Sequence, residues 1–495
     1  MSQISSVRYG HATNSSSSHS IVACRTPERL PDGAQVDEFS YGWEEFVLRR
    51  PEEKAAYLLT NDGRVSEELQ EAVLRAGREH GFDAEALLAR HASASGGAPW
   101  EYGIDHESMG TGAAPRGVSI GEWVRVVMDD RVVILGGNDN VSPRLPQRIV
   151  NEGRVLLTPL TGYDLAVKRD GDAIIFHDAE SGMKFRWSET PYEKASRPEL
   201  VDVKITDRCA HGCAFCYQGS TPDGEDAPLD RVKRIIDTLA KAGVFEMAIG
   251  GGEPTEHPDF AEILLYAAAK GVTPNFTTFS DAWAGDEAIV AAIKQVGRKR
   301  GGIGIGVSVL SEKDIAKLEG VRAAVGDRAQ VIGQTVVGVA PVAVTSRLVR
   351  AIAESGNSVL LLGYKSTGRG EDFSARLPSL DSVRDMIDAF RTEEFLDCWQ
   401  EETPLWSTLS VDTAFLDQYG KALDELGVEM VLRTSPEGAF SMYIDAVSMT
   451  AGPSSWHPER LRPVADAAEA LAMFSTLDPV PVRGDAAEPA AGPSL

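Results

Sequence analysis

The sequence predicts an α/β fold in which a partial (β/α)6 barrel of the TIM type follows an N-terminal α+β domain and precedes a C-terminal extension. From about residue 198 to residue 370, short apolar runs alternate with amphipathic segments of helical period. Such alternation is typical of a parallel sheet with helical crossovers. Three of the five cysteines lie in one loop directly after the first apolar run, at the strand end where such a barrel places its chemistry.

The segment 1–110 is expected to be an N-terminal region that is partly helical. Residues 67–91 carry apolar side chains at helical spacing and predict a helix. The serine-rich stretch 14–20 is typical of a flexible loop. Isolated histidines near a terminus are usually solvated, so His11 and His19 are expected in solvent rather than as ligands or substrate contacts.

Residues 111–195 are predicted to form a small β-rich α+β module. The short runs WVRVVM, RVVIL, RVLLT and AIIFH favour strands, and the sequences GGNDN, RDGD and ESG favour turns between them. No catalytic constellation stands out in this module. Its expected role is therefore packing or the recognition of a substrate.

The core of the predicted barrel covers residues 196–375, and its strands and helices follow one another in a regular order. The six expected strands are 200–205, 245–250, 272–279, 302–309, 329–338 and 358–363. The helices expected between them are 228–243, 257–271, 286–297, 312–325 and 346–356. The first of these helices has its apolar side chains at helical spacing and ends at a glycine.

After the barrel core, the pattern predicts an α/β extension over residues 376–475. A strand, a helix and a further strand are expected within 409–433, and a closing strand is expected within 438–449. Residues 476–495 are rich in proline, alanine and glycine and are predicted to be a disordered tail.

The charge balance of the chain limits its partners. There are 49 lysines and arginines against 74 aspartates and glutamates, so the net charge is -25. This balance argues against nonspecific binding of nucleic acid, although a local basic pocket remains compatible with it. No apolar run is long enough for a membrane span, and the first residues are polar, so a cytoplasmic location with reduced thiols is expected.

The cysteine loop has the spacing C-x3-C-x2-C, formed by Cys209, Cys213 and Cys216. Structural zinc and ordinary [4Fe–4S] clusters both require four protein ligands. His211 could complete a zinc site, but only one residue separates it from Cys209, which makes a shared tetrahedral centre awkward. Alternatively, three cysteines could hold three irons of a cubane and leave the fourth iron open for a ligand, as a catalytic zinc keeps one position open.

This loop resembles the signature of the radical S-adenosylmethionine (radical SAM) superfamily, in which an aromatic residue precedes the last cysteine. Here that residue is Phe215, and Tyr217 follows the cysteine. The resemblance implies a partial barrel over 196–375, one [4Fe–4S] cluster on the three cysteines, and SAM at the open iron, with Phe215 and Tyr217 beside the cofactor. Zinc or unconnected core cysteines are the alternatives.

A second motif follows the second predicted strand, where Gly251, Gly252, Glu253 and Pro254 form the turn sequence GGEP. Superfamily members carry a GGE turn at this place that holds the methionyl amino group of SAM. The chemistry is suitable, because glycines let the backbone approach a ligand closely and a carboxylate pairs with an ammonium group. An ordinary βα turn is the alternative.

Later strand ends match the superfamily less specifically. The resemblance implies that Ser308 touches the SAM ribose and that Ile332 and Val336 face the adenine. Lys365 and Arg369, in the loop after the sixth strand, could meet the SAM carboxylate or an anionic substrate, since arginine suits carboxylate contacts. A solvated glycine-rich loop is the alternative for these two residues.

Neither the sequence GGIGIG nor the two cysteines outside the loop predicts a further cofactor site. The sequence GGIGIG at 301–306 does not have the G-x-G-x-x-G spacing and opens a strand, so it does not predict dinucleotide binding. Cys24 and Cys398 are too few to hold auxiliary clusters of the kind that cysteine-rich C-terminal domains carry in many relatives. Both are expected to be small buried thiols, with Cys398 as a hydrogen-atom donor as the alternative.

The resemblance implies a reaction as well as a fold. A reduced cluster cleaves SAM to a 5′-deoxyadenosyl radical, and this radical abstracts hydrogen from a peptide or amino-acid side chain. The same chemistry on a nucleoside, sugar or other small metabolite is the second hypothesis, and a noncatalytic iron–sulfur redox sensor is the third. The GGEP turn argues against a sensor, which needs no SAM amine site. An electron donor such as flavodoxin or ferredoxin is implied as a partner.

Overall fold

The computed structural model divides the chain into two compact units, each described here by itself. Unit 1 comprises Met1–Val7, Pro27–Asp178 and Lys184–Pro191, and unit 2 comprises Arg8–Thr26, Ala179–Met183 and Tyr192–Leu495. The structure describes residues 3–9, 11–13, 21–24, 38–41, 46–61, 65–95, 103–104, 114–136, 155–157, 165–179, 181–297, 302–391, 406–429, 432 and 436–482.

Unit 1 contains small sheets and four described helices. Its helices are α1 (Pro51–Asn61), α2 (Glu67–His80), α3 (Ala84–Ala94) and α4 (Ile120–Met128). One sheet has the order β1-β10-β9-β8 and consists of Gln3–Arg8, Lys184–Ser188, Ala173–Asp178 and Leu165–Asp170. A second has the order β4-β6-β7, from Phe46–Leu48, Val132–Gly136 and Val155–Leu157, and a third pairs β3 (Ser40–Tyr41) with β5 (Gly103–Ile104).

The helix predicted over 67–91 is in fact two helices. Gly81 has a φ of 77°, which ends α2 in the left-handed conformation that glycine adopts without strain. The Asp83 side chain then accepts a hydrogen bond from the Ala86 N–H and caps the start of α3. The apolar spacing continues from α2 into α3, so it did not indicate that one helix ends at Gly81 and a second helix begins after Asp83.

The β-rich run WVRVVM was interpreted wrongly, because it forms most of helix α4. Ser119 and Glu122 form a reciprocal capping box at the helix start, which satisfies backbone N–H groups that a helix leaves free. Trp123, Val126 and Val127 are buried. Tertiary burial thus overrides the preference of valine for strands.

Unit 2 contains the predicted barrel strands and helices. The strands are β11 (Leu200–Thr206), β12 (Glu246–Gly251), β13 (Thr273–Thr278), β14 (Gly304–Ser308), β15 (Gln330–Val336) and β16 (Ser358–Leu362). The helices are α6 (Leu229–Lys241), α7 (Phe260–Ala269), α8 (Glu287–Val296), α9 (Ile315–Val325) and α10 (Val342–Glu354). Neighbouring strands pair in parallel from β11 to β16. The predicted α/β fold class is therefore confirmed.

Two strands of the C-terminal region extend this parallel set. β17 (Trp406–Val411) pairs with β16, and β18 (Ser441–Asp445) pairs with β11, so the two lie at opposite ends of the parallel strands. Each is followed outward by an antiparallel strand: β2 (Ile21–Cys24) beside β17 and β19 (Thr450–Gly452) beside β18. The described strand pairings therefore leave the barrel open between β17 and β18.

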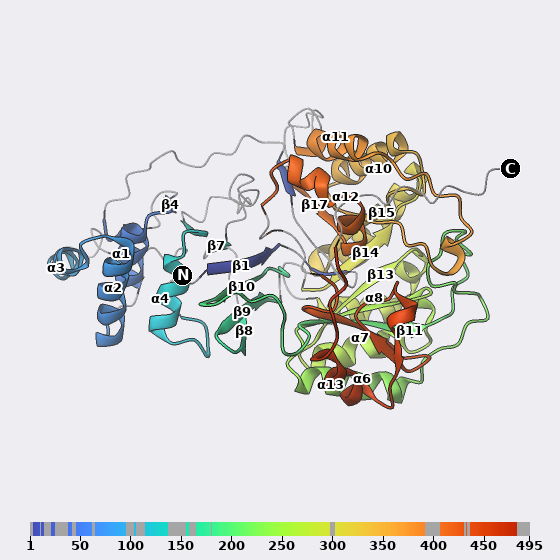
Figure 1. Ribbon diagram of the computed structural model, residues 1–495, viewed down its shortest axis with the longest axis horizontal. Coiled ribbons are helices and arrows are strands. Elements are labelled where there is room, and N and C mark those ends of the chain that lie inside the picture. Colours follow the sequence, from blue (N-terminus) through green and yellow to red (C-terminus); the bar gives the residue numbers. More distant parts are fainter. Residues whose placement is uncertain are drawn as a thin grey trace. The chain divides into compact units, whose positions relative to one another are not determined.

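Other elements surround these strands. The helices are α11 (Leu380–Arg391), α12 (Thr413–Glu425) and α13 (Ala467–Phe474), and the last strand is β20 (Arg462–Pro463). The short 3₁₀ helices are Pro254–Glu256, Ala282–Gly285, Glu312–Asp314, Gly326–Arg328, Gly368–Gly370 and Pro458–Arg460. In unit 2, α10 lies beside α11, and α13 lies beside α6 (Figure 1). Within the described part of the chain, no helix is long and apolar enough to cross a membrane.

The N-terminal residues 8, 9 and 11–13 are an unexpected part of the barrel interior. Arg8 donates to the Glu246 carboxylate at 2.6 Å, and both side chains are buried. His11, which was predicted to be in solvent, is only 4% exposed, so that prediction is wrong. His19, the serine-rich stretch and Cys398 lie outside the described residues.

The alternating glycines of β14 explain how this segment fits inside the barrel. A Cβ atom on Gly304 would lie 2.6 Å from the His11 Cβ, and one on Gly306 would overlap the Gln334 side chain. Side chains alternate between the two faces of a strand, so these glycines clear one face of β14. The sequence GGIGIG thus makes room for another segment of the same chain.

Candidate functional site

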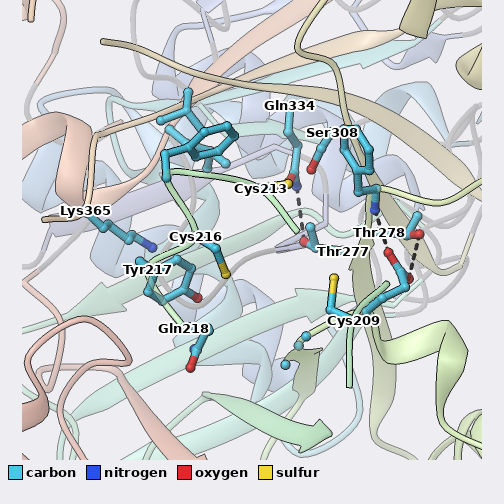
Figure 2. Close-up of a pocket in the computed structure, with 18 of the residues that line it drawn as sticks. Cys209, Cys213, Cys216, Tyr217, Gln218, Thr277, Thr278, Ser308, Gln334 and Lys365 are labelled. Carbon is cyan, nitrogen blue, oxygen red and sulfur yellow. Dashed lines mark hydrogen bonds between the residues drawn. The ribbon is translucent and has the colours of Figure 1, made fainter. Parts of the chain in front are cut away.

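A cavity lies at the carboxyl ends of the parallel strands of unit 2 (Figure 2). Its volume is about 200 Å³, far more than a single water molecule needs. The lining residues are Thr13, Asp202, Cys209, His211, Cys213, Phe215, Cys216, Tyr217, Gln218, Ile249, Gly250, Gly251, Gly252, Glu253, Thr277, Thr278, Phe279, Ser308, Gln334, Val336, Leu362, Gly363, Tyr364, Lys365 and Tyr443. Ligand sites of open α/β sheets and barrels lie at this end of the strands.

The cysteine loop leaves β11 and is closed by its own backbone. The Cys209 N–H donates to the Thr221 carbonyl at 2.9 Å, and the Thr221 N–H donates to the Asp207 carbonyl at 3.2 Å. Gly212 and Gly219 have φ values of 61° and 68°, which turn the chain where other residues would be strained. The loop thereby presents all three cysteines to the cavity.

The loop after β16 holds the cysteine loop from the other side. Arg369 donates from Nε to the Cys213 carbonyl at 2.9 Å and from Nη1 to the Ser220 carbonyl at 2.7 Å. The Thr367 hydroxyl donates to the Tyr217 carbonyl at 3.2 Å. Arg369 does not line the cavity, so in this structure its guanidinium positions the cysteine loop instead of facing a carboxylate of SAM or substrate.

The three thiols of the loop are half-buried. Among the described residues, no three His, Cys, Asp or Glu side chains lie close enough together in this structure to hold one metal ion. Burial raises the pKa of Cys209 and of Cys213, although Arg369 and Lys317 act to lower that of Cys213. Since the thiolate is the metal ligand, cationic irons at the three sulfurs would supply the missing stabilisation.

The GGEP turn is built onto the start of the cysteine loop. The Gly252 N–H donates to the Thr206 carbonyl and the Glu253 N–H to the Arg208 carbonyl, both at 2.8 Å. A Cβ atom on Gly251 would overlap the Thr206 carbonyl oxygen, and one on Gly252 would overlap that of Arg208. The two glycines therefore allow the two motifs to lie backbone to backbone.

The Glu253 carboxylate is buried and already accepts hydrogen bonds from the end of β13. Its Oε1 accepts from the Thr278 hydroxyl at 2.8 Å, and its Oε2 accepts from the backbone N–H groups of Phe279 at 2.8 Å and Ser280 at 3.2 Å. Pro254 begins the short helix that follows and is buried away from the cavity. Glu253 thus ties β12 to β13, and its pairing with a SAM ammonium group stays a prediction.

Polar side chains from several strands meet on one side of the cavity. The Gln334 amide donates to the Thr13 hydroxyl at 2.7 Å, and the Thr277 hydroxyl donates to the Thr13 carbonyl at 2.7 Å. Ser308 lies opposite Gln334 in the register of β14 and β15. Ile332 has the same strand parity as Gln334 but lies two residues deeper and does not line the cavity, whereas Val336 does.

Sequence reasoning missed several cavity residues. Asp202 and Tyr443 come from strand interiors, and Thr13 comes from the terminal segment; Gln218 and Gln334 also line the cavity. Period-two alternation back from the strand ends could have identified Gln334, because it shares a face with Val336. No local signal marks Thr13, since its place depends on the distant strands around it.

Comparison with known proteins agrees with the class that fold and site define, an α/β barrel protein with a three-cysteine loop at its strand ends. Residues 203–392 match the sequence profile of the Radical SAM superfamily. Residues 203–392, which include the cysteine loop and the GGEP turn, therefore carry a Radical SAM domain.

Short stretches match curated relatives. A PqqA peptide cyclase of Bradyrhizobium diazoefficiens is 32% identical over 83 residues, 16% of this chain and 22% of the relative. Mycofactocin maturase MftC of Mycobacterium tuberculosis is 38% identical over 82 residues, 16% of this chain and 21% of the relative. A SAM-dependent nucleotide dehydratase of Selenomonas ruminantium is 36% identical over 72 residues, 14% of this chain and 26% of the relative. The chain thus spans only a small part of the relatives it matches.

Solved structures show weaker likeness. SuiB of Streptococcus suis, bound to S-adenosylmethionine, has a TM-score of 0.41 at 15% identity, covering 59% of this chain and 68% of that chain. The protein anSMEcpe, with bound AdoMet and the Cp18Cys peptide, has a TM-score of 0.39 at 13% identity, covering 56% of this chain and 80% of that chain. These values are too low to carry an argument about activity.

Proposed function

We propose that the protein is a radical SAM enzyme with one [4Fe–4S] cluster and that its substrate is a peptide or amino-acid side chain. When bound, such a cluster reductively cleaves S-adenosylmethionine, and the resulting 5′-deoxyadenosyl radical abstracts a hydrogen atom from the substrate. The observation that carries the proposal is the meeting of the three cysteines with the GGEP turn at one cavity. A flavodoxin or ferredoxin would supply the electron.

The residues of this chain have distinct tasks in the proposal. Cys209, Cys213 and Cys216 would hold the cluster, and the loop containing Arg369 keeps their backbone in place. Apolar side chains among the lining residues, such as Ile249 and Val336, would exclude water from the reacting centre. Cys24 and Cys398 are too few to hold a second cluster, so one cluster per chain is expected.

The peptide class is favoured by the relative named as a PqqA peptide cyclase. The relative named as a nucleotide dehydratase supports the second candidate, the same chemistry on a nucleoside or other small metabolite. Both matches cover less than a fifth of this chain. Anaerobic product analysis by mass spectrometry, with peptides and nucleotides offered in parallel, distinguishes the two classes.

The cluster and the cleavage of SAM have a direct test. The anaerobically reconstituted protein should hold about four irons per chain, and with a strong reductant it should form 5′-deoxyadenosine. Cys213→Ala should abolish the nucleoside, while Cys24→Ala, the control outside the loop, should leave iron content and product unchanged. One zinc per chain without iron would exclude the proposal, and an intact cluster with bound SAM but no cleavage would favour a redox sensor.

A further inference from the structure

The cavity has a second polar side, separate from the side formed by Thr277, Ser308 and Gln334. Figure 2 shows Lys365, Tyr217 and Gln218 on one side of the view, with the sulfur of Cys216 between them and Ser308. The side of Ser308 is the one that the superfamily resemblance assigns to SAM. On the opposite side the resemblance places Tyr217 beside SAM, but it leaves the ligand of Lys365 open between the SAM carboxylate and an anionic substrate.

Lys365 is the only lysine or arginine among the described residues that line the cavity. Its side chain is only 6% exposed, so the ammonium group lies at the cavity rather than in bulk solvent. The nearest carboxylate oxygen is Asp412 Oδ2 at 3.6 Å, which is too long for a hydrogen bond. The ammonium also lies 4.7 Å from the centre of the Tyr217 ring.

An ammonium group has three N–H donors, and a buried donor without an acceptor is costly. Lys365 therefore has donors available to a ligand in the cavity. Burial by itself would lower the pKa of Lys365, but Tyr217 and the carboxylates of Asp412, Glu437 and Asp202 raise it on balance. The side chain is thus charged at neutral pH.

Asp412 lies close to the Lys365 ammonium group but does not form a hydrogen bond with it. Its Oδ1 accepts from the backbone N–H groups of Gly363 and Phe415, both at 2.8 Å, and so caps helix α12. Its Oδ2 is buried and has no hydrogen-bond partner in the described structure. The two backbone hydrogen bonds thus hold the Asp412 carboxylate in place at 3.6 Å from the Lys365 ammonium group.

Other cations near the cavity are already engaged. Lys204 pairs with Asp207 and with Asp445. Lys317 pairs with Asp314 at 2.9 Å. Lys365 differs from both because its donors point to the cavity without a short acceptor.

We propose that Lys365 binds a carboxylate group of the substrate, on the side of the cavity opposite Ser308. This inference rests on the proposed function and adds a substrate class to it, namely molecules that present a carboxylate. A carboxylate oxygen can accept from the ammonium group at short range, which is a strong kind of hydrogen bond. A phosphate dianion fits less well, because the flanking carboxylates of Asp202 and Asp412 repel a second negative charge more strongly.

The first arm of the test separates the two sources of a carboxylate, SAM and substrate. The SAM dissociation constant is measured by equilibrium dialysis for the wild type, Lys365→Met and Lys365→Gln. The control is Lys313→Met, at an exposed lysine of the same unit. We expect less than a twofold change in every variant. A tenfold loss of SAM affinity in both Lys365 variants would assign Lys365 to the SAM carboxylate and overturn the proposal.

The second arm uses matched probes, a mixture of N-acetylated amino acids and their primary amides, which differ only in the carboxylate. The probes retained by the immobilised protein are identified by mass spectrometry. The wild type and Lys313→Met should retain at least one acid about tenfold better than its amide, since a hydrogen bond to a charged group contributes this much. Lys365→Met and Lys365→Gln should lose the preference, and Lys365→Arg should keep part of it.

Several results would overturn the carboxylate site. These are equal retention of acids and amides by the wild type, no retention of either, an unchanged preference in both neutral Lys365 variants, or displacement of the acids by inorganic phosphate rather than acetate. The selection is run with and without reconstituted iron. A preference for acids in a protein that never cleaves SAM would refute the proposed function alone, and cleavage without the preference would refute this inference alone.

Discussion

At the residue scale, the Glu253 carboxylate has to be explained by its contacts as well as by its motif. The Thr278 hydroxyl and the backbone N–H groups of Thr255, Phe279 and Ser280 donate to it. Its Oε1 also accepts from the hydroxyl of Thr255 at 2.7 Å. An ionised carboxylate offers about four acceptor positions, so most of its capacity is used before a ligand binds. Glu253 therefore belongs to a cofactor motif and also connects the ends of β12 and β13 through hydrogen bonds.

We therefore expect Glu253→Ala to lower the free energy of unfolding by about 2–4 kcal/mol, because the buried N–H groups of Phe279 and Ser280 lose their acceptor. Urea denaturation of the full chain measures this change. SAM affinity should fall as well, as the neighbouring strand ends lose their fixed spacing. An unchanged unfolding midpoint combined with lost SAM binding would instead assign the carboxylate to the ligand alone.

At the element scale, β14 shows how a strand can be shaped by what it must accommodate. Gly304 and Gly306 leave space that is filled by His11, Thr13 and Gln334. The Thr13 hydroxyl in turn accepts from the Gln334 amide at 2.7 Å and so fixes a side chain of the cavity. Small residues on one face of a strand therefore mark a contact with another segment.

Gly306→Ala should displace Gln334 from Thr13, because the new methyl group would overlap the Gln334 amide. Overpacking of this kind costs about 1–3 kcal/mol, and hydrogen exchange at the amides of residues 11–13 should become faster. Gly320→Ala is the matched control, since a Cβ atom there meets nothing within 4 Å and the residue lies in helix α9. That change should stabilise the protein by about 0.5–1 kcal/mol. Equal effects of both changes would contradict the packing argument.

At the scale of the whole molecule, the sequence predicted those helices and strands whose structure follows from the spacing of apolar residues along the chain. Helix α6 buries Val232, Ile235, Ile236 and Leu239, as their spacing predicted. The run WVRVVM was misassigned because a strand preference cannot reveal the capping box before it. The contact of Lys365 with Asp412 could not be foreseen either, since it joins residues far apart in the sequence.

The N-terminal segment gives the clearest limit of sequence reasoning. Arg8 and His11 are polar residues near a terminus, and such residues are usually solvated. Their burial depends on acceptors from strands much later in the chain: Glu246 for Arg8, and Gln330, whose side chain accepts from the His11 backbone N–H at 3.1 Å. A polar terminal segment can therefore belong to the interior when the barrel supplies its partners.

The buried pair of Arg8 and Glu246 tests how strongly this segment holds the molecule together. Arg8→Met should lower the free energy of unfolding by about 3–5 kcal/mol, because it leaves a buried carboxylate without its cation. Glu246→Gln keeps an acceptor for the Asn275 amide, which donates to Oε1 at 3.1 Å, but it leaves Arg8 without its anion. The double variant should therefore be more stable than the sum of the two single losses predicts, and thermal and urea unfolding of the four proteins give this coupling. Strict additivity would show that the two charges do not depend on each other and that Arg8 and residues 11–13 are held by their other contacts.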